Sequence, residues 1–277
     1  MTTDKQEIKV AVLDLYNGVA NQGMRCILDI IARYREVNDL NLTYKVFDVR
    51  QKEEVPGTEF DIYISSGGPG DPLESEGTVW DDKYFELIDA LEAHNQSAAG
   101  PKKHVFFICH SFQLMCRRMG LGAVNLRRSP SFGVLPVHVT EHGLFEQIFE
   151  GLTDPFFAVD SRSWQVVNAD NEQLKAKGAA LLAIEKERPH VDLPRALMAI
   201  RFNECFIGTQ FHPEADPFGM RAYLITDEKK QEVVDEHGEQ KYIEMLERLE
   251  DPDMIMLTEI TIIPNFLDQA ILSFQEA

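Results

Sequence analysis

Cys109 lies at the point where a short apolar run gives way to a helix-like segment. Residues 104–108 (HVFFI) are typical of a buried strand, and residues 110–118 (HSFQLMCRR) are typical of a helix. A cysteine at such a turn faces open space at the end of a sheet, where the first N–H groups of the helix favour its thiolate. This arrangement could aim a nucleophile at a carbonyl carbon. A small buried core residue is the alternative interpretation of the same cysteine.

His212 and Glu214 belong to a second segment that could support such a nucleophile, residues 208–214 (GTQFHPE). A histidine can take the proton of a thiol and later give it to a leaving amine, and a carboxylate can orient the imidazole. Pro213 disfavours a helix here, and in an extended chain both side chains would point the same way. A surface histidine beside a proline turn is the alternative interpretation.

A glycine-rich turn follows the third apolar run, at residues 65–72 (SSGGPGDP). Glycines let the backbone approach a ligand closely and present N–H donors to it. The turn lacks the Lys-Ser/Thr ending of a phosphate-binding loop, so we do not expect a nucleotide there. An ordinary tight turn is the alternative.

The elements that must position these residues alternate between strand and helix. Helical patterns at 22–36 and 79–94 separate apolar runs at 8–15, 43–49, 61–65 and 104–108. This alternation predicts an α/β fold with a mainly parallel sheet and helices on both faces. Further strands are expected at 132–140, 156–159, 179–184, 195–201 and 205–210. The last two are joined by a short hairpin and indicate an antiparallel extension of the sheet. Ligands of such sheets bind beyond the carboxyl ends of the strands.

Composition and charge exclude several classes of function. Of the 277 residues, 44% are hydrophobic and 26% charged, which is ordinary for a soluble globular protein. A net charge of −19 argues against general binding to nucleic acids or anionic membranes. We expect no transmembrane helix, no signal peptide and no disulfide framework from the four cysteines, and therefore a cytoplasmic protein.

The C-terminal part of the chain is expected to be helical. Residues 219–250 are highly charged but carry apolar residues at helical spacing, which predicts a solvated amphipathic helix. A closing helix is expected over 262–272, with Pro264 near its start. We therefore divide the chain into a catalytic domain, 1–216, and a helical C-terminal extension packed on the same domain, 217–277.

Three motifs together resemble one known family. The run GPGDP from Gly68, the pair Cys109 and Gln113, and the run TQFHPE ending at Glu214 occur in the order and spacing of class I glutamine amidotransferase domains. The resemblance covers roughly residues 8–216 and is to the stand-alone, GMP-synthase-like glutaminase type. It implies a flavodoxin-like version of the predicted sheet and a glutaminase that uses no cofactor or metal.

The resemblance also implies roles for individual residues. Cys109 would attack the side-chain amide of glutamine, or a related γ-glutamyl amide, and form a γ-glutamyl thioester that water then hydrolyses. His212 would be the general base and acid, and Glu214 would orient it. The backbone N–H groups of Gly68 and His110 would form the oxyanion hole.

The substrate itself would be held by further residues that match the family motifs. Gly70 and Gln113 would hold the glutamyl group. Ser163 and Trp164 belong to a segment whose backbone holds the amino-acid end of the substrate, with Arg162 where the family usually has histidine.

The chain departs from the family beside the nucleophile. The family pattern is Gly-x-Cys-x-Gly, whereas Phe107 and Ser111 occupy the two glycine positions here. Serine is small, but phenylalanine requires extra room in the neighbouring strand. We interpret the His110 side chain as pocket wall, with tuning of Cys109 as an alternative.

Several functions fit these residues. In an amidotransferase, ammonia or an amine is transferred to an acceptor, which a separate synthetase subunit would supply. A stand-alone hydrolase of γ-glutamyl peptides or amides is the first alternative. A related Cys-His-Glu acyltransferase fits the glycine-rich turn and Gln113 less well. A catalytically degenerate regulatory or scaffolding subunit is the contrasting alternative.

Overall fold

One mixed sheet organises the chain. The computed structural model describes residues 6–97, 100–251 and 254–275, and its strands in those ranges form a nine-stranded sheet in the order β2-β1-β3-β4-β9-β8-β7-β5-β6. The first five strands in that order pair in parallel. They are β2 (Leu42–Asp48), β1 (Ile8–Asp14), β3 (Ile62–Ser65), β4 (His104–Ile108) and β9 (Phe206–Thr209).

The remaining strands form the antiparallel extension that the hairpin pattern predicted. They are β8 (Leu197–Arg201), β7 (Ala180–Glu185), β5 (Ala123–Val139) and β6 (Phe156–Val167). Both β5 and β6 are longer than the apolar runs at 132–140 and 156–159 indicated. The extra length of β5 carries exposed polar residues such as Ser129, which give no apolar signal.

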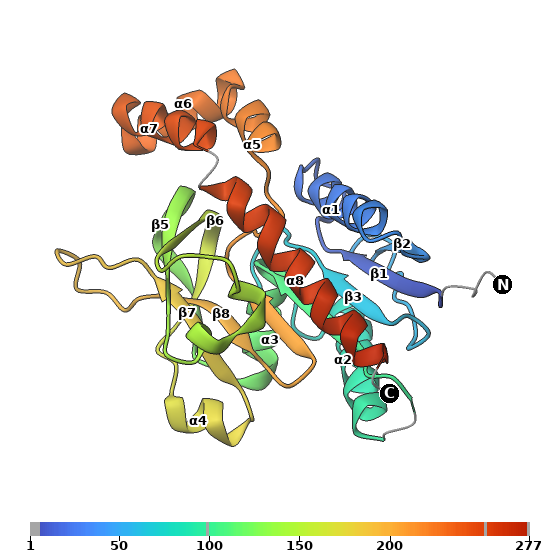
Figure 1. Cartoon of the computed structure of the whole chain (residues 1–277). Helices are drawn as coiled ribbons and strands as arrows, with labels where there is room; N and C mark the ends of the chain where they lie inside the picture. Colours follow the sequence, from blue (N-terminus) through green and yellow to red (C-terminus); the bar gives the residue numbers. More distant parts are fainter. Residues whose placement is uncertain (1–5, 98–99, 252–253, 276–277) are drawn as a thin grey trace.

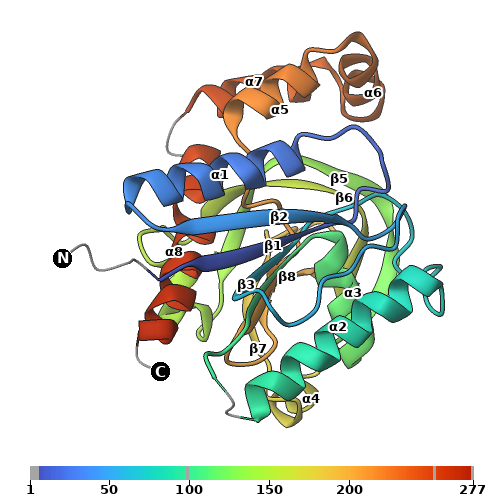
Figure 2. The same cartoon turned by 90° about the vertical axis from the view of Figure 1, so that its right-hand side faces the viewer.

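Helices cover both faces of the parallel half, as predicted (Figures 1 and 2). On one face, Val10 and Val12 of β1 pack with α1 (Gly23–Val37) and α8 (Ile255–Gln275). On the other face, Ala11 and Leu13 pack with α2 (Val79–Gln96) and α3 (His110–Met119). Alternate residues of a strand point to opposite faces, so the centre of β1, from Val10 to Leu13, is apolar on both. The short helix α4 (Asn171–Ala176) and the 3-10 turns η1 (Gly143–Phe145) and η2 (Gln147–Phe149) complete this part.

The final helix differs from our expectation in two ways. It begins at Ile255, so Pro264 lies inside it and not near its start. A window within it, Ile255–Phe274, is also long and apolar enough to cross a membrane, whereas we expected no such segment. In this structure 56% of that window is buried, and Ile262, Phe266 and Leu267 pack on the sheet.

The charged segment before α8 forms three helices, not the single helix that its apolar spacing indicated. These are α5 (Pro217–Leu224), α6 (Asp227–His237) and α7 (Glu239–Glu250), which we call the cap helices. The Thr226 side chain caps the start of α6, and Gly238, with φ of 86°, separates α6 from α7. Figure 1 shows the cap helices together at one end of the molecule. The domain boundary at residue 216 stays a prediction.

A separate apolar cluster attaches the cap helices to the antiparallel extension. Val134 of β5 and Val159 of β6 pack there with Leu224, Val233 and Met245. The cap helices therefore stand over the strands β5 and β6, beside the carboxyl ends of the parallel strands.

Candidate active site

Cys109 occupies a strained turn between β4 and α3. Its backbone has φ of 47° and ψ of −95°, a combination that residues other than glycine rarely adopt. The turn is held on both sides, because the Cys109 N–H donates to the Thr209 carbonyl at 2.7 Å and the Cys109 carbonyl accepts from Gln113 N–H at 3.0 Å. The side chain is 5% exposed and reaches the cavities described below.

Phe107 is accommodated by a glycine on the neighbouring strand. Gly208 of β9 lies beside it in register, and a Cβ at Gly208 would lie only 2.9 Å from both the Cβ and the carbonyl oxygen of Phe107. The Phe107 ring points to the helix-covered face, where it packs edge-on against Phe202 and Phe206. The bulky residue is thus housed away from Cys109.

Ser111, the second departure, ties the turn to the sheet. Its hydroxyl accepts from the Ile108 N–H at 2.8 Å and lies 2.9 Å from the Ser65 carbonyl. The hydroxyl is fully buried, so these hydrogen bonds are shielded from water. A serine at this position therefore links the carboxyl ends of β3 and β4 beside the nucleophile.

The structure brings His212 and Glu214 to Cys109. The His212 N–H donates to the Val159 carbonyl of β6 at 2.8 Å, which fixes the segment after β9. The imidazole Nδ1 lies 2.8 Å from Oε1 of Glu214. The Cys109 side chain interacts with the same ring by a hydrogen bond and by its charge. A Cβ at Gly67 would lie 3.0 Å from His212 Cε1 and 3.6 Å from Cys109 Cβ, so the two side chains flank the same glycine.

The charges around His212 favour the imidazolium. Burial alone lowers the pKa of the imidazole, but the negative charges of Glu214 and of a Cys109 thiolate outweigh it and hold the pKa of His212 well above its ordinary value. Glu214 is 1% exposed, and its Oε2 atom is buried with no hydrogen-bond partner in the described structure. The arrangement can therefore store a proton on His212 next to a thiolate.

Tyr16 is a neighbour of this pair that the sequence did not indicate. A Cβ at Gly23 would lie 2.1 Å from the Tyr16 hydroxyl and 3.2 Å from Glu214 Oε1. Burial, and then the charge of Glu214, raise the pKa of Tyr16 well above its usual range, so the phenol stays neutral. Tyr16 follows β1 and belongs to no motif, although its place after a buried strand was a usable signal.

The glycine-rich turn lies directly across from Cys109. A Cβ at Gly68 would lie 2.3 Å from the Leu15 carbonyl oxygen, and Gly70 has φ of 102°, so both positions require glycine. The Arg50 guanidinium, from the turn after β2, donates to the Pro69 carbonyl at 2.6 Å and so fixes the glycine-rich turn. Gly68 and Gly70 both line the cavity at Cys109.

Gln113 takes part in a buried amide network. Its Nε2 donates to the Trp164 carbonyl at 3.0 Å and to Gln210 Oε1 at 3.2 Å. Gln210, which was not among the predicted site residues, in turn places its Nε2 3.6 Å from Cys109 Sγ. The Ser161 carbonyl lies 3.9 Å from the same sulfur.

The His110 side chain is not a pocket wall. It is 1% exposed, is absent from the linings of the two cavities at Cys109, and its Nε2 has no partner within the described residues. Burial, with the nearby charges of Arg50 and Arg117, lowers its pKa to about 3. A neutral ring therefore lies next to the nucleophile, while its backbone N–H, at the first position of α3, has no helical acceptor.

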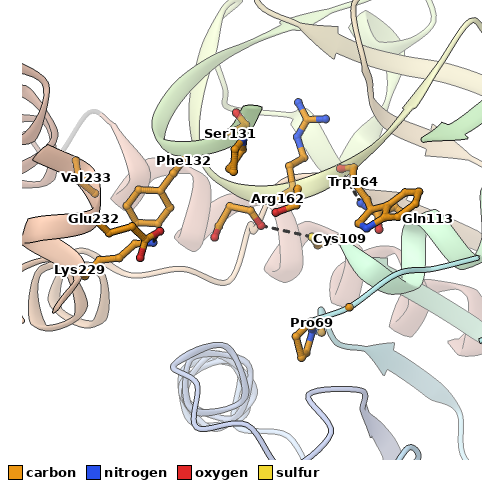
Figure 3. A pocket seen from close by; sticks show the side chains of 15 residues that line it. Pro69, Cys109, Gln113, Ser131, Phe132, Arg162, Trp164, Lys229, Glu232 and Val233 are labelled. Carbon is orange, nitrogen blue, oxygen red and sulfur yellow. Dashed lines mark hydrogen bonds and ion pairs between the residues drawn. The ribbon is translucent and has the colours of Figure 1, made fainter. Parts of the chain in front are cut away.

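Two cavities meet at Cys109. The smaller, of about 300 Å³, is lined by Gly70, Gln113, Ser163 and Trp164 and is shown in Figure 3. The larger, of about 650 Å³, contains His212 and Glu214. The predicted site residues other than the His110 side chain therefore gather around one point at the carboxyl ends of β3, β4 and β9.

The cap helices complete the smaller cavity with residues that we did not predict. Lys229, Glu232 and Val233 of α6 line its end opposite Gln113 and Trp164 (Figure 3). The Lys229 side chain is only 11% exposed, with its Nζ 2.5 Å from Glu232 Oε1. The ammonium also lies 4.3 Å from the centre of the Phe132 ring. The Lys229–Glu232 pair in the cavity wall could therefore bind the ammonium and carboxylate groups of an amino acid.

Arg162, which replaces the family's usual histidine, belongs to a buried network of ion pairs. Figure 3 shows its side chain directed away from Cys109. The guanidinium is buried and pairs with Asp160 at 2.7 Å and with Glu185 at 3.2 Å. Its backbone still lines the cavity between Ser161 and Ser163. Among the described residues, no group of three or more histidine, cysteine and acidic side chains is arranged to hold a metal ion.

Comparison with known families decides the classification. A family model described as glutamine amidotransferase class-I matches residues 27–230, about three-quarters of the chain. The chain belongs to the class I glutamine amidotransferase family. Enzymes of this family hydrolyse glutamine, and the sheet described above is the flavodoxin-like sheet that the family uses. A search of curated proteins finds no match.

Solved structures share this fold across almost the whole chain. A glutamine amidotransferase from Thermotoga maritima superposes with a TM-score of 0.68 at 16% identity, covering 95% of this chain and 98% of its own. A protein from Thermoplasma acidophilum that is described as a GMP synthase subunit gives 0.57 at 17% identity, with 97% and 96% covered. The glutaminase domain of a Trypanosoma brucei CTPS, solved with bound acivicin, gives 0.58 at 14% identity, with 96% and 94% covered. At these identities the likeness concerns the fold.

Proposed function

We propose that this amidotransferase domain hydrolyses the side-chain amide of glutamine, or of a related γ-glutamyl compound, through a thioester on Cys109. The observation that carries the proposal is the convergence of Cys109, His212 and Glu214 at the point where two cavities meet. The smaller of these cavities is walled by Gly68 and Gln113. Acyl transfer requires a thiolate nucleophile, a proton donor and a cavity that binds the acyl group.

The reaction proceeds in two steps. The Cys109 sulfur forms a bond to the amide carbon, and the oxyanion so formed is held by the N–H groups of Gly68 and His110. The C–N bond breaks as His212 gives its proton to the leaving nitrogen. Water then attacks the thioester carbon and gives a proton to His212. The C–S bond breaks, which restores the thiolate and releases the γ-carboxylic acid. That acid gives its remaining proton to solvent and leaves as glutamate.

The substrate's amino-acid end would lie away from Cys109. The smaller cavity runs from Gln113 and Trp164 to Lys229 and Glu232 (Figure 3). The Lys229 ammonium would receive the α-carboxylate, and Glu232 would receive the α-ammonium group. Gly70 and the backbone of Ser163 and Trp164, which the resemblance predicts to hold the glutamyl group and the amino-acid end, line the same cavity.

The proposal is tested by following glutamate release from glutamine with the full chain. Cys109→Ala abolishes turnover if the thioester is formed there, because no other described cysteine lines the smaller cavity. Cys205→Ala is the matched control, since Cys205 is buried at the far end of β9. Equal rates for the Cys109→Ala variant and the unchanged protein would refute the proposal, and loss of turnover in the control alone would do the same.

A further inference from the structure

The larger cavity lies on the leaving-group side of Cys109. It shares Gly68, Cys109 and Ser161 with the smaller cavity, but it alone contains His212 and Glu214. In the proposed reaction the departing nitrogen must face the group that protonates it, which is His212. With the glutamyl chain beside Gln113, whatever is attached to that nitrogen extends into the larger cavity.

The size of this cavity exceeds what ammonia needs. Its volume is about 650 Å³, whereas a molecule the size of water or ammonia takes about 30 Å³. Cavities of several hundred Å³ usually enclose small organic ligands. The volume is therefore suited to an amine with a sizeable substituent.

The lining indicates an apolar substituent. The loop after β1 contributes Val19 and Ala20, and α5 contributes Met220, Ala222 and Tyr223. Val19 and Tyr223 are about half exposed at 52% and 45%, so apolar surface stands open beside the catalytic groups. Covering apolar surface of this kind with a ligand removes it from water and makes binding more favourable.

The charges of the lining disfavour an anionic substituent. The charged side chains that line the cavity are His212, Glu214 and Asp216. His212 pairs with Glu214, and Asp216 holds Arg25 through two hydrogen bonds of 2.9 Å and 3.0 Å. Both acidic groups thus already have a cationic partner. Within the described residues no lysine or arginine lines this cavity, so a carboxylate placed here would find no unpaired cation to receive it.

We propose that the larger cavity selects γ-glutamyl amides of neutral, apolar amines over both glutamine and γ-glutamyl peptides with a free carboxylate. This inference rests on the proposed function, because it assumes attack by Cys109. It names the part of the substrate that leaves, and it makes the protein a stand-alone amide hydrolase that releases an amine.

Three substrates test the inference, namely glutamine, γ-glutamyl-phenethylamide and γ-glutamyl-phenylalanine. The last two differ only by the carboxylate. Burying an aromatic ring raises kcat/KM about tenfold or more, so we expect at least that ratio of phenethylamide to glutamine. We expect a similar preference for the phenethylamide over γ-glutamyl-phenylalanine. Glutamine as the better substrate, or equal rates for the two aromatic compounds, would overturn the inference and leave the proposed function standing.

A variant checks that the preference arises in this cavity. Ala222→Trp fills it from α5, and we expect the phenethylamide-to-glutamine ratio of kcat/KM to fall at least tenfold. Val37→Trp, at an exposed position at the end of α1, introduces the same side chain elsewhere and should keep the ratio. A ratio that is unchanged in Ala222→Trp would contradict the assignment.

Binding supplies a readout that does not depend on turnover. In the Cys109→Ala protein, isothermal titration calorimetry should give a Kd for γ-glutamyl-phenethylamide at least tenfold below that for glutamine. Equal or weaker binding of the phenethylamide would refute the selective cavity even if glutamine is hydrolysed. If none of the three compounds binds or is turned over, the proposed function itself fails.

Discussion

His110 should make the protein lose stability in mild acid. Its pKa falls from an ordinary value of 6.5 to about 3, because burial and the charges of Arg50 and Arg117 disfavour the imidazolium. In the unfolded chain His110 therefore binds a proton below pH 6.5, whereas in the folded chain it stays neutral until the pH approaches 3. The stabilising contribution is complete above pH 6.5 and is lost as the pH falls.

The size of the effect follows from the pKa difference. At pH 4.5 the unfolded histidine lies two pH units below its pKa, which corresponds to about 2.7 kcal/mol at 1.36 kcal/mol per unit. At pH 7 the same term is only about 0.2 kcal/mol. His110→Leu, a substitution of similar size, should thus reduce the acid-induced loss by about 2.5 kcal/mol. His104, buried with a pKa of about 4, should give a similar reduction in His104→Leu.

The assay is urea unfolding at pH 7 and pH 4.5, followed by circular dichroism. Comparing each variant with the unchanged protein at both pH values cancels the contributions of other titrating groups. If His110→Leu loses as much free energy of unfolding as the unchanged protein, to within about 0.5 kcal/mol, His110 titrates alike in both states. The assignment of a neutral His110 ring beside Cys109 would then be wrong.

Three further outcomes are expected. Glu214→Gln should lower the pKa of His212, because burial then outweighs the remaining attraction, and NMR titration of the imidazole would reveal an unchanged pKa if the ion pair is unimportant. Gly68→Ala should lower kcat/KM at least about tenfold, since its Cβ would meet the Leu15 carbonyl, whereas Gly57→Ala, which meets only a flexible side-chain end, is the control. Lys229→Met should raise KM for glutamine about tenfold with little change in kcat if Lys229 holds the α-carboxylate. A fall in kcat alone would place that residue elsewhere in the mechanism.

The sequence was informative where the local pattern alone decides the structure. The run before Cys109 is short, apolar and bounded by a helix, so both the strand and the turn were predicted. His212 and Glu214 were placed together because two residues on an extended segment share a side. The structure brings these residues together as predicted, and their chemical roles stay predictions.

Other features depend on contacts between distant segments, which no local pattern records. Tyr16 reaches the site from a strand end that carries no motif, and Gln210 lies within the run TQFHPE but gives no local sign that its amide approaches Cys109. Lys229 arrives from α6, and its charged sequence gave no sign that one lysine would be nearly buried. The room for Phe107 comes from Gly208, about a hundred residues away in the sequence. Pro264 was misplaced because proline is common at a helix start, while tertiary packing allowed α8 to continue through it.

The most direct test of the account is the reaction of Cys109 with a glutamine-like electrophile, read by peptide mass spectrometry. We expect a chloroketone analogue of glutamine to label Cys109 stoichiometrically, to leave Cys26, Cys116 and Cys205 unmodified, and to be slowed at least about tenfold by His212→Ala near neutral pH. Glutamine in excess should protect the thiol. Labelling that is absent from Cys109, or that is indifferent to both glutamine and His212, would contradict the central claim that Cys109 is an activated nucleophile at a γ-glutamyl site.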